Sequence, residues 1–278
     1  MKKLLSVFFV LACAAALYAQ VAPSAAAPPA SSVPAPASLT QDPSAAKARA
    51  ILDQMVQALG GQRWLNLQNS YTHGSIAAFY QGKPTGVTVN FWSWHTPTAD
   101  RIDLDETKHD KHNWVQVFTG NRCWEITFRG RNPLPKDQCE EDIRRHDHSI
   151  ETAVKVWMND PSTVLMYEGQ SLVETKLAQQ VTLLNTQNDA ITIRVDADTH
   201  LPLSRSFSWR DPVYHDKDED LEEYDDYHPI DGLPTPFAIT RFHNGDMTQQ
   251  RFVLKAGYNV TLPPDGFDLT AIAAGIHH

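Results

Sequence analysis

The second half of the chain consists of short runs in which apolar and polar residues alternate, separated by turn residues. From residue 163 onward these runs include "AITIRVD", "LPLSRSFSW" and "TPFAITRFHN", and "NWVQVFTG" and "RCWEITF" alternate similarly before them. Alternation with a period of two is typical of antiparallel strands that bury one face. In "GVTVNFWSWH" it sets Val87, Val89 and Phe91 against Thr88, Asn90 and Trp92. So many strands joined by short turns predict an α+β chain, mainly antiparallel β, with one large curled sheet.

Two segments have a helical period instead. Asp42 and Pro43 are expected to cap and begin a first helix, "SAAKARAILDQMVQALGG", in which Gly60 supplies the left-handed stop. A second helix is expected from about Gln138 to Met158. Its apolar stripe consists of Ile143, Ile150, Val154 and Trp157.

The stretch "RVDADTHLPLSRSFSW" places Asp196, Asp198 and His200 on alternate positions, as a small metal site could. Asp196 and Thr199 are also residue types whose side chains satisfy the amides of a turn. Pro202 stands at the start of the next run, where its missing N–H costs least. We interpret the stretch as a corner between two strands, with the metal site as the alternative.

The N-terminus has the charge, apolar core and small residues of a secretory signal peptide, residues 1–19, with cleavage after Ala19. A lipoprotein cut before Cys13, which would anchor the chain by a lipid, is the alternative. Residues 20–44 are rich in Pro, Ala and Ser and predict a disordered linker. One folded domain is expected over 45–270, with a tail at 271–278. The expected location is the periplasm.

The formal net charge of -9 becomes more negative when Lys2 and Lys3 leave with the signal peptide. Nucleic-acid binding is therefore not expected, because phosphate neutralisation supplies most of that affinity. In an oxidising compartment Cys123 and Cys139 are expected to form a disulfide between a strand end and a helix start. Closing a loop of about 15 residues stabilises by about 3 kcal/mol in the chain-entropy model. A thiolate nucleophile or a zinc ligand pair is the alternative.

The acidic insertion "RDPVYHDKDEDLEEYDDYHPID" carries Asp216, Asp218, Asp220 and Glu222 at alternating positions. It does not fit a helical calcium loop, because Leu221 stands where the glycine belongs. A solvated hairpin or edge strand over 211–231 is expected, its charges preventing pairing with other chains. Weak calcium binding or docking of a basic partner are the alternatives.

Histidine pairs are the other candidates for chemistry. His146 and His148 are two apart on a predicted helix and point in different directions. His109 and His112 lie in a predicted loop, where they could converge on a metal. No nucleophile elbow, phosphate loop or dinucleotide glycine pattern occurs in the sequence. No catalytic residue, metal ligand or cofactor is predicted, and a metal-assisted hydrolase using His109, His112 or the acidic stretch is the enzymatic alternative.

The order of these parts resembles the periplasmic outer-membrane lipoprotein carriers, the Lol-type half-barrel proteins, and their relatives that bind regulators or lipids. The similarity lies in a leading helix closed by "ALGG", a strand meander, the "VDADTHLP" corner, "YHPIDGLPTPFAI" and the closing "YNVTLPPDGFD", over about residues 45–268. It departs from a true carrier by its longer folded part and its acidic insertion. A relative that binds or senses another lipid is therefore expected.

This resemblance implies an incomplete barrel with helices across its open face and an apolar cavity that holds acyl chains, or a partner's lipidated or hydrophobic segment. An envelope protein partner and a monomeric state are also expected. An interaction module acting through the acidic face is the non-catalytic alternative. Core packing is the alternative role for the tryptophans. The candidates to line the cavity are Trp92, Trp94, Trp114, Trp124 and Trp209, with Ile150, Val154 and Trp157 from the helices.

Overall fold

The computed structural model describes residues 42–106, 112–211 and 214–276. The expected signal peptide lies outside these residues, as does the linker up to residue 41. The helices are α1 (Pro43–Leu59), α2 (Gln62–Leu65), α3 (Lys136–Asp147), α4 (Ile150–Lys155) and α5 (Leu269–Gly275), with a 3₁₀ turn η1 (Trp157–Asn159). The strands are β1 (Ser70–Tyr80), β2 (Lys83–Thr96), β3 (Ala99–Asp105), β4 (Trp114–Thr119), β5 (Arg122–Thr127), β6 (Gly130–Pro133), β7 (Val164–Val173), β8 (Lys176–Leu184), β9 (Ala190–Asp196), β10 (Pro202–Arg210), β11 (Lys217–Ile230), β12 (Leu233–His243) and β13 (Asp246–Tyr258).

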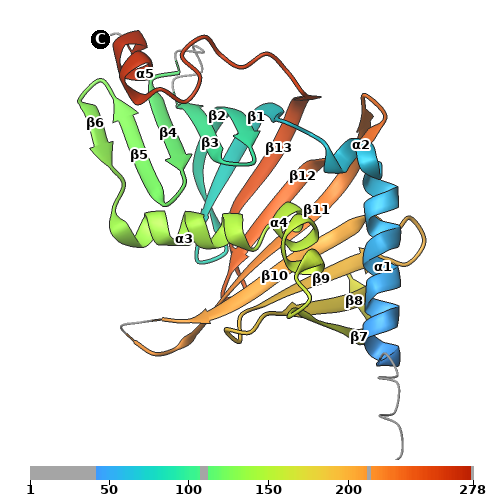
Figure 1. Ribbon diagram of the computed structural model, residues 1–278. Helices are drawn as coiled ribbons and strands as arrows, with labels where there is room; N and C mark the ends of the chain where they lie inside the picture. The colour runs from blue at the N-terminus through green and yellow to red at the C-terminus, as the bar shows by residue number, and fades with distance from the viewer. Residues whose placement is uncertain (1–41, 107–111, 212–213, 277–278) are drawn as a thin grey trace, which may run out of the picture. The chain divides into compact units, whose positions relative to one another are not determined.

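The described strands form one sheet in the order β6-β5-β4-β3-β2-β1-β13-β12-β11-β10-β9-β8-β7. Every neighbouring pair is antiparallel. β1 pairs with β13, so the beginning and the end of the strand meander meet inside the sheet, while β6 and β7 are its two edges (Figure 1). The sheet is not closed, which confirms the predicted antiparallel, incomplete barrel with helices across one face.

The two faces of the sheet are covered by different helices. We call the face that carries α1, α3 and α4 the inner face (Figure 1). There the apolar stripe of α1 packs on Val181, Leu183, Ile191 and Ile193 of β8 and β9. On the opposite, outer face Ile272 of α5 packs on three residues of β4 and β5: Val115, Val117 and Ile126. Part of the tail expected at 271–278 is therefore helical and packed, and residues 277–278 lie outside the described ranges.

Helix α1 forms as its sequence predicts. The Asp42 side chain accepts a hydrogen bond from the Ser44 backbone N–H, and Pro43 is the first helical residue. The predicted stripe is buried, with Leu52 and Met55 fully enclosed. Gly60, with φ of 122°, ends the helix. None of the helices in the described ranges is long and apolar enough to span a membrane.

The single helix predicted from Gln138 to Met158 is wrong, because the chain breaks between α3 and α4. The Ser149 side chain accepts a hydrogen bond from the Thr152 backbone N–H, which caps a new helix start. Ile143 remains on α3, while Val154 and Trp157 join the core beneath α1. The break lets α3 and α4 follow different parts of the curled sheet (Figure 1).

Two local predictions on the strands are confirmed. Cys123 of β5 and Cys139 of α3 form a disulfide with a Cα–Cα distance of 5.5 Å, which fastens the helix to the sheet. The "VDADTHLP" stretch is a corner between β9 and β10. An oxygen of Asp196 accepts hydrogen bonds from the backbone N–H groups of Asp198 (2.8 Å) and Thr199 (2.9 Å).

Candidate ligand-binding cavity

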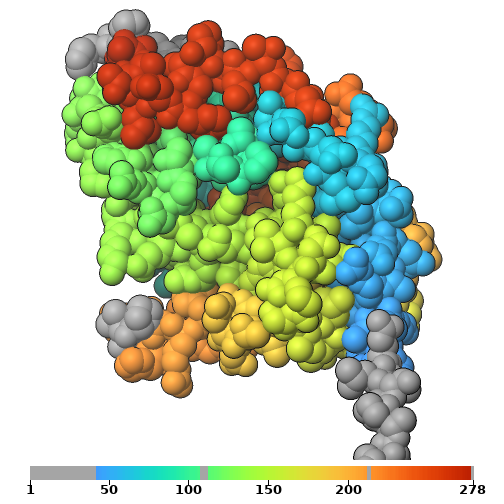
Figure 2. All heavy atoms as spheres, viewed as in Figure 1, coloured from blue at the N-terminus to red at the C-terminus, as the bar shows by residue number. Residues whose placement is uncertain are grey.

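Two adjoining cavities lie between the inner face and the helices above it, with volumes of about 420 Å³ and about 870 Å³. Pro97, Asp100, Arg145, His146 and Arg241 line both, so the cavities meet at the junction of α3 and α4. Figure 2 shows a hollow beside the yellow-green helices, with the red-brown atoms of the C-terminal strands at its floor. Both volumes are in the range of about 300–1,000 Å³ that is usual for small-molecule sites.

The larger cavity has an apolar wall on β1 to β4. Ile76 of β1 and Val89 of β2 lie side by side in the sheet, and Leu104 of β3 packs against them. The polar helix α3 lies opposite this wall. The apolar side chains that β1 to β4 contribute to the cavity are Ile76, Ala78, Val87, Val89, Ala99, Ile102, Leu104, Trp114 and Phe118, and α3 adds Ile143. Val87 was expected on the buried face of its strand but is 49 % exposed.

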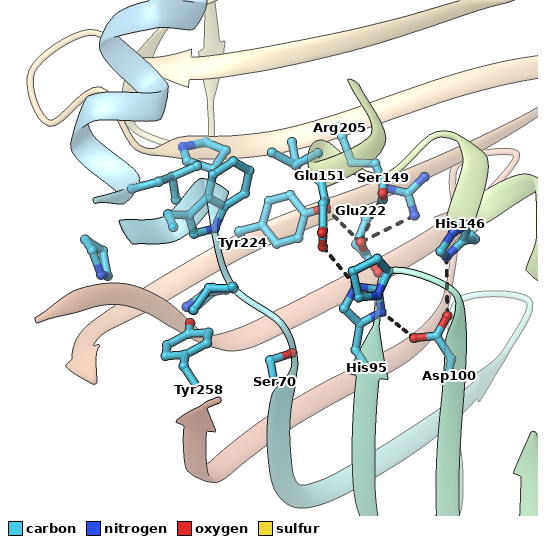
Figure 3. A pocket seen from close by; sticks show the side chains of 18 of the residues that line it. Ser70, His95, Asp100, His146, Ser149, Glu151, Arg205, Glu222, Tyr224 and Tyr258 are labelled. Atoms are coloured by element: carbon cyan, nitrogen blue, oxygen red, sulfur yellow. Dashed lines mark hydrogen bonds and ion pairs between the residues drawn. The ribbon is translucent and has the colours of Figure 1, made fainter. Parts of the chain in front are cut away.

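The smaller cavity lies beside α1, α2 and α4 (Figure 3). Leu59, Trp64 and Ile150 form its apolar side. Tyr227 donates a hydrogen bond to the Pro202 carbonyl (2.7 Å), and the hydroxyl of Tyr258 bonds that of Thr235 (2.7 Å). These tyrosines therefore present their rings to the cavity while their hydroxyl groups are satisfied.

The acidic insertion forms an interior strand, not the solvated hairpin or edge strand that its charge predicted. β11 lies between β10 and β12, and Asp220 is fully buried. Asp220 accepts a hydrogen bond from Arg145 of α3 (2.9 Å). Glu222 binds Arg241 (3.1 Å) and Arg205 (3.4 Å) and accepts a hydrogen bond from the Tyr224 hydroxyl (2.8 Å). Because these arginines neutralise them, neither carboxylate is free for calcium or for a docking surface.

Burial and the neighbouring arginines shift the pKa of Glu222 in opposite directions. Burial alone raises the pKa of this carboxyl, but Arg205 and Arg241 outweigh it and hold the pKa well below the usual range. Burial also lowers the pKa of the Arg205 guanidinium, and Glu222 reverses this and raises it. Both groups are therefore charged at neutral pH.

A histidine cluster lies where the two cavities meet (Figure 3). Nδ1 of His95 lies 2.5 Å from Asp100 Oδ1, and its Nε2 lies 2.9 Å from Glu151 Oε2. Nδ1 of His146 lies 3.3 Å from Asp100 Oδ2. Burial lowers the pKa of His95, but the hydrogen bonds to Asp100 and Glu151 outweigh it and raise the pKa to about 10. The cluster therefore links β2 and β3 to α3 and α4 through a charged imidazolium.

His95, Asp100 and His146 are also the described residues that could hold a metal ion, since one ligand atom from each lies within 4.8 Å of the others. Both ring nitrogens of His95 already face carboxylates, so an ion would have to displace a proton. His95, Asp100 and Glu151 were not singled out from the sequence. The turn "HTPTAD" between β2 and β3 could have indicated that His95 and Asp100 lie opposite each other.

The histidines considered for a metal-assisted hydrolase do not meet in this cavity. His109 lies outside the described residues. His112 lies on the outer face, where its Nδ1 is 3.0 Å from Asp103 and its ring lies 4.0 Å from that of Trp92. His148 turns away from His146, as predicted, and bonds Asp189 (2.8 Å).

This histidine cluster predicts that the protein is most stable in mildly acidic solution. Burial raises the pKa values of Asp100 and Glu151, but hydrogen bonds from the histidines and Lys155 lower both to about 2. Their stabilisation is fully present above about pH 4.5 and is lost as the pH falls toward 2. The stabilisation that protonated His95 contributes is complete below about pH 6.5 and is lost as the pH rises toward 10.

Urea unfolding from pH 2 to pH 10 tests this expectation. The free energy of unfolding should be greatest between about pH 4.5 and 6.5. His95→Gln should remove much of the decline on the alkaline side, whereas His228→Gln, at an exposed histidine of β11, should keep it. Equal pH profiles for the two variants would contradict the charged imidazolium.

The residues proposed to line the cavity divide into three groups. Trp114 lines the larger cavity and Ile150 the smaller one, while Trp209 lies beside α3, with its ring 4.3 Å from the guanidinium of Arg144. Val154 and Trp157 are buried in the core beneath α1. The remaining three tryptophans lie on the outer face. Trp92 and Trp94 alternate along β2 with residues of the inner face, and Trp124 lies on the same side of β5 as Ile126, which packs against α5.

No protein-family model and no curated protein matches this chain. Solved structures share its fold. A DUF1329 family protein from Desulfovibrio piger has a TM-score of 0.57 and 14 % identity, over 82 % of this chain and 98 % of that one. A putative outer membrane lipoprotein-sorting protein domain from Vibrio parahaemolyticus has a TM-score of 0.54 and 9 % identity, over 82 % and 99 %.

A LolA superfamily protein from Nitrosomonas europaea is also similar, with a TM-score of 0.48 and 11 % identity over 79 % of this chain and 96 % of that one. At these identities the likeness of the first two structures concerns the fold alone. The chain has the incomplete-barrel fold of lipoprotein-sorting domains, as its sequence predicted.

Proposed function

We propose that this protein acts in the bacterial cell envelope, in the periplasm, and binds an acyl chain or another long apolar group in the paired cavities of its inner face. The observation that carries the proposal is the wall of Ile76, Val89 and Leu104, which borders about 870 Å³ of unfilled space. Burying such surface contributes about 25 cal/mol per Å² and is not directional. Selectivity for the apolar part of the ligand should therefore be loose.

Two further observations support the proposal. One fold neighbour is described as a putative outer membrane lipoprotein-sorting protein domain, and acyl chains are the apolar part of lipoproteins. The disulfide between Cys123 and Cys139 is of the kind that persists in oxidising compartments outside the cytosol. The ligand is therefore proposed to be a lipid, or the lipidated or hydrophobic segment of an envelope protein.

A binding assay with a cavity-filling variant tests the proposal. A fluorescent acyl probe should bind the purified protein, and Ala78→Trp, which places a bulky ring in the larger cavity, should weaken binding about tenfold or more. Leu172→Trp, at a 71 % exposed position on β7, is the matched control and should bind as the unmodified protein does. Equal affinity of the two folded variants would contradict binding in this cavity.

A further inference from the structure

The lining of the larger cavity changes from apolar side chains on β1 to arginine side chains on the neighbouring strand, β13. Arg251 of β13 lies opposite Ile76 of β1 in the sheet, and Ile76 in turn lies opposite Val89 of β2. Arg251 and Arg241 line the cavity on its β12–β13 side, whereas the apolar wall occupies β1 to β4. A ligand in this cavity therefore contacts guanidinium groups at one end and hydrocarbon at the other.

Arg251 lacks the carboxylate partner that the neighbouring arginines have. Arg145, Arg205 and Arg241 each form ion pairs within 4.0 Å. Among the residues that the structure describes, no carboxylate oxygen comes within that distance of Arg251. Its guanidinium carbon lies 4.8 Å from the centre of the Phe91 ring. A guanidinium without an ion pair at the edge of an apolar wall is costly to bury unless an anion completes it.

Arg251 stays positively charged, although carboxylates of α3 also line this cavity: Glu141, Asp142 and Asp147. Burial, with Arg241 as the next cause, lowers the pKa of Arg251 to about 10, although Glu222 and Asp100 raise it. Arg251 is therefore still charged at neutral pH. Glu222 is already bound by Arg205 and Arg241. The Nε group of Arg241 is buried without a hydrogen-bond partner among the described residues. Arg251 is therefore a charged group without an ion pair on the lining of this cavity, next to a second arginine, Arg241.

We infer that the ligand is an anionic acyl amphiphile, whose carboxylate or phosphate head group binds Arg251 beside Arg241 while its chain lies over Ile76, Val89 and Leu104. This inference rests on the proposed function, because it assigns a chemical class to the ligand of the same cavity. Guanidinium groups bind carboxylate and phosphate through paired, charge-assisted hydrogen bonds. The apolar wall supplies affinity, and Arg251 selects for the charge and sets the direction of the chain.

Ligands of equal chain length and different head group test this inference. Displacement of an uncharged fluorescent acyl probe from the full chain compares palmitate, palmitoyl lysophosphatidate and hexadecanol. At least one of the two anions should bind about tenfold or more tightly than hexadecanol. The tighter of the two anions identifies the head group.

Variants at Arg251 separate charge from packing. Arg251→Met should reduce the affinity for the preferred anion about tenfold and leave that for hexadecanol unchanged, and Arg251→Lys should restore part of the loss. Arg122→Met, at an exposed arginine of β5, is the control and should change neither. Thermal unfolding checks that each variant is folded.

Two outcomes overturn different statements. If hexadecanol binds as tightly as both anions, or if folded Arg251→Met binds the anions unchanged, the anionic class is wrong while binding in the cavity stands. If the protein binds neither the anions, hexadecanol nor the probe, the proposed function itself is wrong.

Discussion

Replacing Glu222 by glutamine should lower the free energy of unfolding by about 3–5 kcal/mol, because it leaves the buried guanidinium of Arg205 and the partly buried one of Arg241 without their shared carboxylate. The side chain of Arg205 is 3 % exposed and that of Glu222 is 14 % exposed, so water does not replace the lost charge. The glutamine would also turn N–H donors toward arginine donors. Urea unfolding at neutral pH measures the effect.

Glu219→Gln is the matched control, because Glu219 lies on the same strand, is exposed and points to the other side of the sheet. Its effect should stay within about 0.5 kcal/mol. If both variants unfolded at the same urea concentration, the cluster around Glu222 would be hydrated, and the buried ion network described above would be wrong.

Replacing Gly74 by alanine should destabilise the protein by about 3 kcal/mol, because the pairing of β1 with β13 leaves no room for a side chain at this position. A Cβ atom there would lie 1.9 Å from the Phe252 carbonyl oxygen and 3.0 Å from the Val253 Cα. Both contacts are with backbone, so the strands themselves would have to move apart. The register shifts between His73 and Gly74, where this close approach occurs.

Gly275→Ala provides the comparison for this variant. Gly275 ends α5, and no atom lies within 4 Å of the position that its Cβ would take. Alanine there should be neutral or stabilise by up to about 1 kcal/mol. Thermal unfolding of both variants measures the difference, and a Gly74→Ala protein as stable as Gly275→Ala would contradict the pairing of β1 with β13.

Much of the fold could be predicted because it depends on local chemistry. The cap at Asp42, the stop at Gly60 and the corner at Asp196 each involve interactions within a few residues along the chain. Alternation along the strands indicates one antiparallel sheet for the same reason. The disulfide could be predicted from two cysteines in a chain whose sequence predicts export.

The cavity could not be predicted in the same way because its charges meet only in the fold. Glu222 appeared to be solvated since its partners Arg205 and Arg241 are 17 and 19 residues away along the chain. The sequence of an acidic strand is the same whether its carboxylates face water or arginine side chains, so the local pattern does not distinguish the two cases. Glu151 likewise meets His95 across 56 residues, through the helix break at Ser149 that the continuous helical pattern concealed.

The tryptophans show a further limit of strand periodicity. Trp92 and Trp94 were expected in the cavity from the family resemblance, but Ser93 lines it instead, and Phe91 is buried on the same side of the strand. Alternation separates two sets of residues, but it does not say which set faces the helices when both are apolar. On the outer face Trp94 lies beside the segment that leads to α5.

The central claim is that the inner cavity holds an acyl ligand, and native mass spectrometry tests it most directly. The protein should be exported to the periplasm, purified without detergent, and weighed before and after solvent extraction. We expect an adduct near one per protein that releases an acyl lipid on extraction and is reduced in Ala78→Trp. A protein of bare mass that also fails to bind a fluorescent fatty acid would contradict the claim.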